Sequence, residues 1–150
     1  MHRSSFVLAA TTALALAASG QGWAGTSSAS STSSGDITTS WGDRTRIQLT
    51  WTDRNSFRDG TLAVADQTCD DRTLYATLTV RTGSGTTLAA EDRHNTRGCG
   101  TTTDFRDLRA TDPSGIRSVT MTLCRRQAGM PDHCETRYTS FNPYNPSYGF

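Results

Sequence analysis

Apolar and polar side chains alternate with a period of two residues over much of the chain. Residues 46–52 place an apolar side chain at every second position, and residues 74–81 show the same pattern more clearly. The apolar positions of these two segments are Ile47, Leu49, Trp51, Leu74, Ala76, Leu78 and Val80. Such alternation is typical of β-strands that bury one face. No segment shows the period of an amphipathic helix.

Weaker alternating segments lie at residues 61–65, 86–91, 103–109, 116–126 and 133–141. Glycine- and proline-containing turn signals separate several of them, at residues 82–85, 112–115 and 128–132. About seven short strands at regular spacing predict an all-β fold, namely a small antiparallel β-sandwich of immunoglobulin-like or jelly-roll-like type. Residues 108–122 resemble a strand, turn and strand of bacterial immunoglobulin-like domains.

The first 24 residues have the three parts of a secretory signal peptide. A short basic start precedes an apolar stretch at residues 6–18, which is too short to span a bilayer. Gly22 and Ala24 are small residues at the positions that a signal peptidase requires for a cut before Gly25. Cuts after Ala18 or Gly20 are alternatives. We therefore expect a secreted, extracellular chain without a membrane span.

Residues 25–40 consist almost entirely of Ser, Thr, Gly and other small residues. Such a tract buries too little apolar surface to offset the entropy of ordering, so it predicts a flexible arm. The predicted organisation is then an arm at 25–40, a β-sandwich domain at 41–141 and an extended C-terminal tail at 142–150. A bare spacer is the alternative interpretation of the arm.

Large aliphatic residues are scarce after the signal peptide, and a thin core usually needs covalent support. The four cysteines, Cys69, Cys99, Cys124 and Cys134, predict two disulfides in an exported chain. Three pairings are possible, and we favour Cys69–Cys99 with Cys124–Cys134. A zinc site is the rival, but the chain has no Cys-x-x-Cys pair.

The charges of the chain nearly cancel, with 15 Arg and Lys against 14 Asp and Glu. Removal of Arg3 with the signal peptide leaves equal numbers, and every cation is an arginine. This balance gives no electrostatic reason to expect nucleic acid or an anionic membrane as a partner.

Residues that could carry chemistry are few. His94 and His133 remain after processing, and Asp92 precedes His94 by two positions, but a Gly-x-Ser-x-Gly nucleophile turn is absent. The acidic residues Asp66, Asp70 and Asp71 do not have the spacing of a calcium loop. We therefore expect no enzyme, no metal, no cofactor and no small-molecule substrate.

Two segments remain as candidate protein-binding surfaces. The first is the arm with the residues that follow it, which could add as a strand to a partner's sheet or lie in its groove. Its candidate contact residues are Gly35, Asp36, Ile37, Thr38 and Trp41. The second is the loop that a Cys124–Cys134 bond would close, because a loop that is already ordered binds at lower entropic cost. Its candidate residues are Arg125, Arg126, Gln127 and Met130.

The stapled loop has other interpretations. It could act as a secreted protease inhibitor, although the cysteine spacing differs from that of the subtilisin-inhibitor family, which residues 119–124 resemble. It could also be a hairpin with a structural disulfide only. A cell-wall or carbohydrate-binding module is a third function, which would use Trp41, Trp51, Tyr75 or the Tyr-rich tail.

A signal peptide, a small-residue arm and a small β-domain with disulfides resemble, as a layout, the adaptor subunit of the umbrella toxin particles that actinobacteria secrete. In that family the N-terminal arm enters a cleft of a lectin-bearing subunit with a degenerate protease-like domain. The adaptor's β-domain docks on helical repeats of a large toxin subunit. The resemblance implies a non-catalytic adaptor that joins other secreted proteins.

Overall fold

The computed structural model describes residues 29–89 and 91–145. These residues form nine β-strands and no helix. The strands are β1 (Ser31–Thr38), β2 (Arg44–Asp53), β3 (Ser56–Asp66), β4 (Thr73–Thr82), β5 (Thr87–Ala89), β6 (Arg93–His94), β7 (Thr101–Thr111), β8 (Ile116–Arg126) and β9 (His133–Phe141). The predicted signal peptide, residues 1–24, lies outside the described residues. In the described part, no helix is long and apolar enough to cross a membrane.

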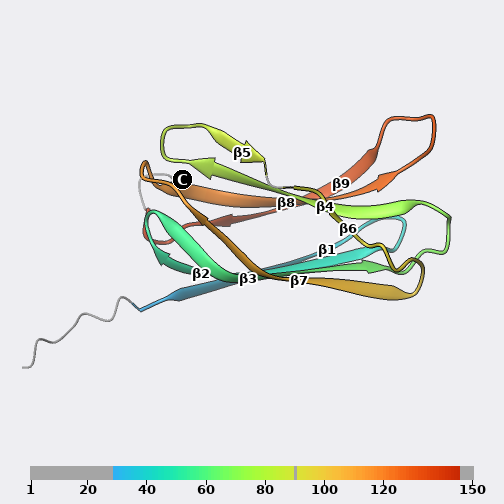
Figure 1. Ribbon diagram of the computed structural model, residues 1–150, viewed down its shortest axis with the longest axis horizontal. Helices are drawn as coiled ribbons and strands as arrows, with labels where there is room; N and C mark the ends of the chain where they lie inside the picture. Colours follow the sequence, from blue (N-terminus) through green and yellow to red (C-terminus); the bar gives the residue numbers. More distant parts are fainter. Residues whose placement is uncertain (1–28, 90, 146–150) are drawn as a thin grey trace, which may run out of the picture.

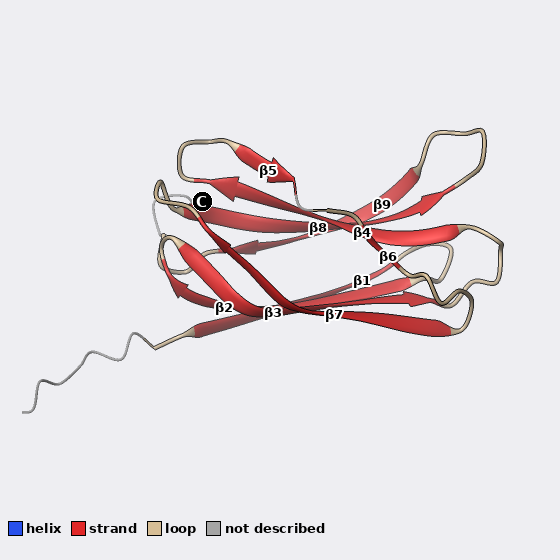
Figure 2. Cartoon of the chain, viewed as in Figure 1, coloured by secondary structure: helices blue, strands red, loops and turns tan. Residues whose placement is uncertain are grey.

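The strands form two antiparallel sheets that face each other, as Figures 1 and 2 show. One sheet has the order β1-β2-β3-β7, and the other has the order β5-β4-β8-β9, with β6 also pairing with β4. The predicted all-β sandwich is therefore confirmed. Its first three strands lie in one sheet, whereas in immunoglobulin domains the third strand lies in the sheet opposite the first two.

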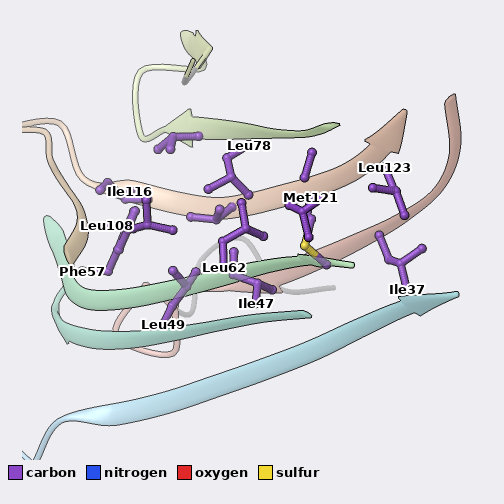
Figure 3. Packing of buried hydrophobic residues seen from close by; sticks show 14 of the residues in the cluster. Ile37, Ile47, Leu49, Phe57, Leu62, Leu78, Leu108, Ile116, Met121 and Leu123 are labelled. Carbon is purple, nitrogen blue, oxygen red and sulfur yellow. The ribbon is translucent and has the colours of Figure 1, made fainter. Parts of the chain in front are cut away.

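The core lies between the sheets and contains the alternating residues that the sequence pattern marks, together with others such as Ile37 and Phe57 (Figure 3). Ile47, Leu49 and Trp51 of β2 are all fully buried. Across the core they face the second sheet, whose buried side chains include Leu78, Val119, Met121 and Leu123. Because successive side chains of a strand point to opposite faces, the polar residues between these positions face the solvent.

The prediction of a flexible arm is wrong for residues 31–38. These residues form β1, an edge strand that pairs with β2 in one continuous register from Ser31↔Trp51 to Thr38↔Arg44. Ile37 fills a place in the core, and β2 offers an edge whose backbone groups need partners. The domain therefore begins at Ser31 and not at residue 41. Residues 25–28 lie outside the described residues.

The predicted tail is also folded at its start. The side-chain amide of Asn142 is buried and donates hydrogen bonds to the carbonyls of Asp53 and Ile116, both at 3.0 Å. The turn that follows β9 is therefore hydrogen-bonded to the end of β2 and to the start of β8. Residues 146–150 lie outside the described residues.

Both predicted disulfides are confirmed. Cys69 is bonded to Cys99 across 30 residues, and Cys124 is bonded to Cys134 at the neck of the β8–β9 hairpin. The second bond joins residues that are direct partners in the β8–β9 ladder, with their Cα atoms 4.0 Å apart. Such bonds stabilise a small domain by restricting its unfolded chain.

Replacement of a core residue of β2 should destabilise the domain strongly. We expect Ile47→Ala to lower the free energy of unfolding by about 2–5 kcal/mol, because the cavity adds to the lost transfer free energy. Gln48→Ala, at the exposed neighbouring position, is the matched control and should change stability little. Urea unfolding followed by tryptophan fluorescence measures both, and equal effects of the two changes would contradict the assigned orientation of β2.

Candidate functional site

The β1–β2 turn and the stapled loop meet at one end of the sandwich. Trp41 lies in the turn between β1 and β2, and its ring centroid is 4.3 Å from the guanidinium carbon of Arg125. The ring of His133, at the start of β9, is 4.7 Å from the same tryptophan ring. A cation over an aromatic face is attractive, so Arg125 connects β8 to the β1–β2 turn.

Residues 39–43, which we call the clamp, are fixed to the domain by several hydrogen bonds. The backbone N–H of Ser40 donates to Glu135 Oε2 at 2.8 Å, and its hydroxyl donates to Oε1 at 2.6 Å. Glu135 belongs to β9, so these bonds join the first strand pair to the last strand. The carboxylate thus accepts two well-aligned donors from one residue.

The other side of the clamp is bonded to the β3–β4 connection. Asp43 is buried, and its Oδ1 accepts the backbone N–H groups of Gln67 and Thr68 at 2.8 and 2.9 Å. The Thr68 hydroxyl in turn donates to the Trp41 carbonyl at 2.6 Å. The clamp is therefore held from both sheets.

Two carboxyl groups near the clamp have shifted pKa values. The two hydrogen bonds from Ser40 lower the pKa of Glu135, and the nearby His133 and Arg125 act in the same direction. The pKa of Asp66 is raised, first by burial and then by the charges of Asp43 and Asp70. A carboxylate that accepts hydrogen bonds holds its charge, whereas a buried one resists ionisation.

Arg125, predicted as a contact residue of the stapled loop, is turned toward the domain. Its side chain is only 17% exposed, and its Nη1 lies 3.3 Å from Asp70 Oδ2. Asp70 follows Cys69 directly, so the first disulfide lies beside this ion pair. Arg125 therefore supports the end of the sandwich and is not at the tip of the loop.

The other three predicted loop residues lie at or near the tip. Met130 is 58% exposed, and its backbone N–H donates to the Gln127 carbonyl at 3.2 Å, which closes a turn. Arg126 is about half exposed, with its Nε 3.6 Å from Asp132 Oδ2. The disulfide, the turn and this ion pair together order the loop.

Tyr75 supports the loop from β4, which the alternation alone did not reveal. The pattern places Tyr75 on the solvent face of β4, yet the side chain is only 5% exposed. Its hydroxyl donates to Asp132 Oδ2 at 2.5 Å, and its ring lies 5.0 Å from the ring of His94. Burial, then the hydrogen bond to Asp132 and the charges of Asp132 and Asp92, raises the pKa of Tyr75 to about 12.

The predicted arm residues are engaged inside the domain. Ile37 is 2% exposed and points toward Leu123 of the opposite sheet in Figure 3. Asp36 Oδ1 lies 2.7 Å from Arg46 Nε on the exposed face, and the Thr38 hydroxyl accepts Arg44 Nε at 3.2 Å. Gly35 lies under the ring of a tyrosine in β9. The structure thus places these side chains in contacts within the chain.

The histidines and acids considered for chemistry are not brought together. Asp92 Oδ1 accepts the hydroxyl of Thr77 at 2.7 Å, whereas His94 stacks on Tyr75. Asp70 pairs with Arg125 and Arg72. Among residues 29–89 and 91–145, no group of three or more His, Cys, Asp or Glu side chains could hold a metal ion.

Comparison with known proteins adds no relative to this description. No protein-family model, no curated protein and no solved structure matches the chain.

The bond between Ser40 and Glu135 should make the stability of the domain depend on acid pH. Because folding lowers the pKa of Glu135, its contribution is complete above pH 4.5, the ordinary value, and is lost as the pH falls through the folded value. Glu135→Gln should flatten this dependence and lower the urea midpoint at neutral pH. Glu91→Gln, at an exposed carboxylate away from the clamp, is the control. If the stability of the wild type and that of Glu135→Gln depended on acid pH in the same way, the assigned role of the bond between Ser40 and Glu135 would be refuted.

Tyr75 should titrate at unusually high pH. A tyrosine whose pKa rises from 10 to about 12 on folding loses stability as the pH rises between these values, because only the unfolded chain ionises there. Ultraviolet absorbance should show one tyrosine titrating near pH 12, and Tyr75→Phe should remove that step. If Tyr75→Phe instead leaves the late step in place, another tyrosine has the raised pKa.

Proposed function

We propose that this chain is a secreted, non-catalytic protein-binding module, an adaptor that joins subunits of an extracellular complex. The observation that carries the proposal is the placement of the start of β1, where the N-terminal segment enters the domain, relative to the stapled loop; only the other end of β1 lies beside that loop. In Figure 1, β1 begins at one end of the sandwich, and the β8–β9 loop projects from the opposite end. Partners bound at the two ends of one domain would not obstruct each other.

The stapled loop supports a role in protein binding because it is ordered before any partner arrives. Its neck is closed by Cys124–Cys134, and Tyr75 and Arg126 both contact Asp132 within it. An exposed Met130 at the tip is a flexible apolar side chain that adapts to a partner's surface. Preorganisation of this kind lowers the entropic cost of binding.

The polar groups at the clamp support a structural role there rather than catalysis. Ser40, Glu135 and His133 lie close together, but the Ser40 hydroxyl donates to the carboxylate. A nucleophilic serine instead needs a base that can take its proton, usually a histidine. This arrangement stabilises a charge and leaves the hydroxyl unactivated.

Secretion is part of the proposal, and the two disulfides support it. Disulfides form and persist in oxidising compartments such as the extracellular space. The layout-level resemblance to the adaptor of actinobacterial umbrella toxin particles gives the proposal its most specific form. On that interpretation the N-terminal segment enters one partner and the β-domain docks on another.

Co-purification from the native culture medium tests this function. We expect the tagged intact chain to bring down two larger secreted proteins. A chain lacking residues 25–36 should lose one of them, and the double variant Arg126→Ala, Met130→Ala should lose the other. Gln48→Ala, on an exposed sheet face, should keep both. Circular dichroism checks that each variant folds.

Two results would overturn the proposal that this chain is an adaptor. The intact chain could elute alone at the mass of a monomer. Alternatively, it could inhibit a secreted protease, and Arg126→Ala or Met130→Ala could abolish that inhibition. The second result would establish the protease-inhibitor alternative, in which the stapled loop occupies a protease cleft.

A further inference from the structure

The first six residues of β1 bury little apolar surface against the rest of the domain. The inward positions are Ser31, Ser33 and Gly35, and all three are partly exposed. The one charge of the segment, on Asp36, forms an ion pair with Arg46 in which both side chains are mostly exposed. Exposed ion pairs contribute little to stability. Residues 31–36 therefore gain little from apolar contact or from charge.

Two tyrosine hydroxyls contact the backbone of this N-terminal region instead. Tyr138 of β9 donates to the carbonyl of Ser34 at 2.8 Å, and Tyr144, after β9, donates to the carbonyl of Ala29. The ring of Tyr138 lies so close over Gly35 that any Cβ there would overlap it. Glycine is thus required for the ring to pass over the strand and reach the carbonyl.

If this segment detached, the buried indole N–H of Trp51 would keep a hydrogen-bond acceptor. The indole N–H of Trp51 donates to Ser33 Oγ at 3.1 Å and to Ser140 Oγ at 3.2 Å. If Ser33 left, Ser140 would still accept this buried donor. Detachment of residues 31–36 therefore does not leave the Trp51 indole N–H without an acceptor, and the backbone groups of β2 that pair with the segment would exchange their partners for water.

Detachment would stop at Ile37. That side chain is buried in the core, and the clamp that follows is bonded to Glu135 on one side and to Thr68 on the other. A weakly held segment thus adjoins a firmly held one. The boundary between them lies at residues 36 and 37.

We propose that residues 31–36 are a releasable strand, latched by the hydroxyls of Tyr138 and Tyr144, which swings out from the clamp and adds to an open sheet edge of a partner protein. The side chains of this segment are too small and polar to bind by burial, so its affinity has to come from backbone hydrogen bonds, as in strand addition. This inference rests on the proposed function, in which the arm contacts a partner.

Hydrogen exchange on the isolated mature chain tests the latch without any partner. The Ser34 carbonyl accepts the hydroxyl of Tyr138, so we take this carbonyl to point away from β2. Backbone groups of successive strand residues point in opposite directions, so the amides of Ser33 and Gly35 are then the ones that bond to β2. We expect the double variant Tyr138→Phe, Tyr144→Phe to raise their exchange rates about tenfold, because the hydrogen bonds to Ser34 and to Ala29, just before the segment, are lost. Amides of β4 should not change.

Tyr75→Phe is the matched control, since it removes a tyrosine hydroxyl bond at the stapled loop and should leave Ser33 and Gly35 unaffected. Unchanged exchange at Ser33 and Gly35 in the double variant would overturn the latch. Fast exchange throughout β1 and the clamp would also overturn it, because the boundary at Ile37 would not exist.

A covalent lock tests release. Ser33 Oγ and Ser140 Oγ are 2.5 Å apart, so cysteines at both positions should form a disulfide that ties β1 to β9. We expect the locked chain to lose the same partner that deletion of residues 25–36 loses, whereas Ser33→Cys alone retains it. Retention of that partner by the locked chain would overturn release. If the deletion itself loses no partner, the proposed function fails, while the exchange result still decides the latch.

Discussion

Two sheets with few large side chains between them have to be held together at their margins. Trp51 is the largest residue fully inside this core, and its indole N–H is shared by serines from the two sheets, Ser33 in β1 and Ser140 in β9. While β1 is in place, this contact sets the distance between the two edge strands on that side. The Cys69–Cys99 disulfide and the clamp follow the same principle, because each joins segments at the rim of the sandwich, whereas Cys124–Cys134 joins two strands of one sheet.

The strongly alternating parts of the fold could be predicted from the sequence. β2 and β4 carry apolar residues at every second position, and these residues form the core. The favoured disulfide pairing is confirmed as well, and its predictable part is Cys124–Cys134, because these cysteines flank a turn signal that favours a bond across a hairpin. Both inferences rest on neighbours that are close in sequence, where period and spacing decide the structure.

What could not be predicted depends on residues far apart in the chain. β1 has serines and a glycine at its inward positions, so it lacks the apolar signal of a strand. Its order comes from β2 and from Tyr138, which lies more than a hundred residues later. Similarly, Arg125 turns inward because Trp41 and Asp70 receive it. A local pattern contains no information about such partners.

The charges on β2 have a consequence for solubility. If β1 leaves, β2 becomes the edge of its sheet, and a bare edge invites pairing between molecules and aggregation. Arg44 and Arg46 stand at alternate exposed positions on the half of β2 next to the clamp. Charged side chains on an edge strand are a usual defence against that pairing. The chain therefore carries on its second strand the protection that its first strand, almost free of charge, lacks.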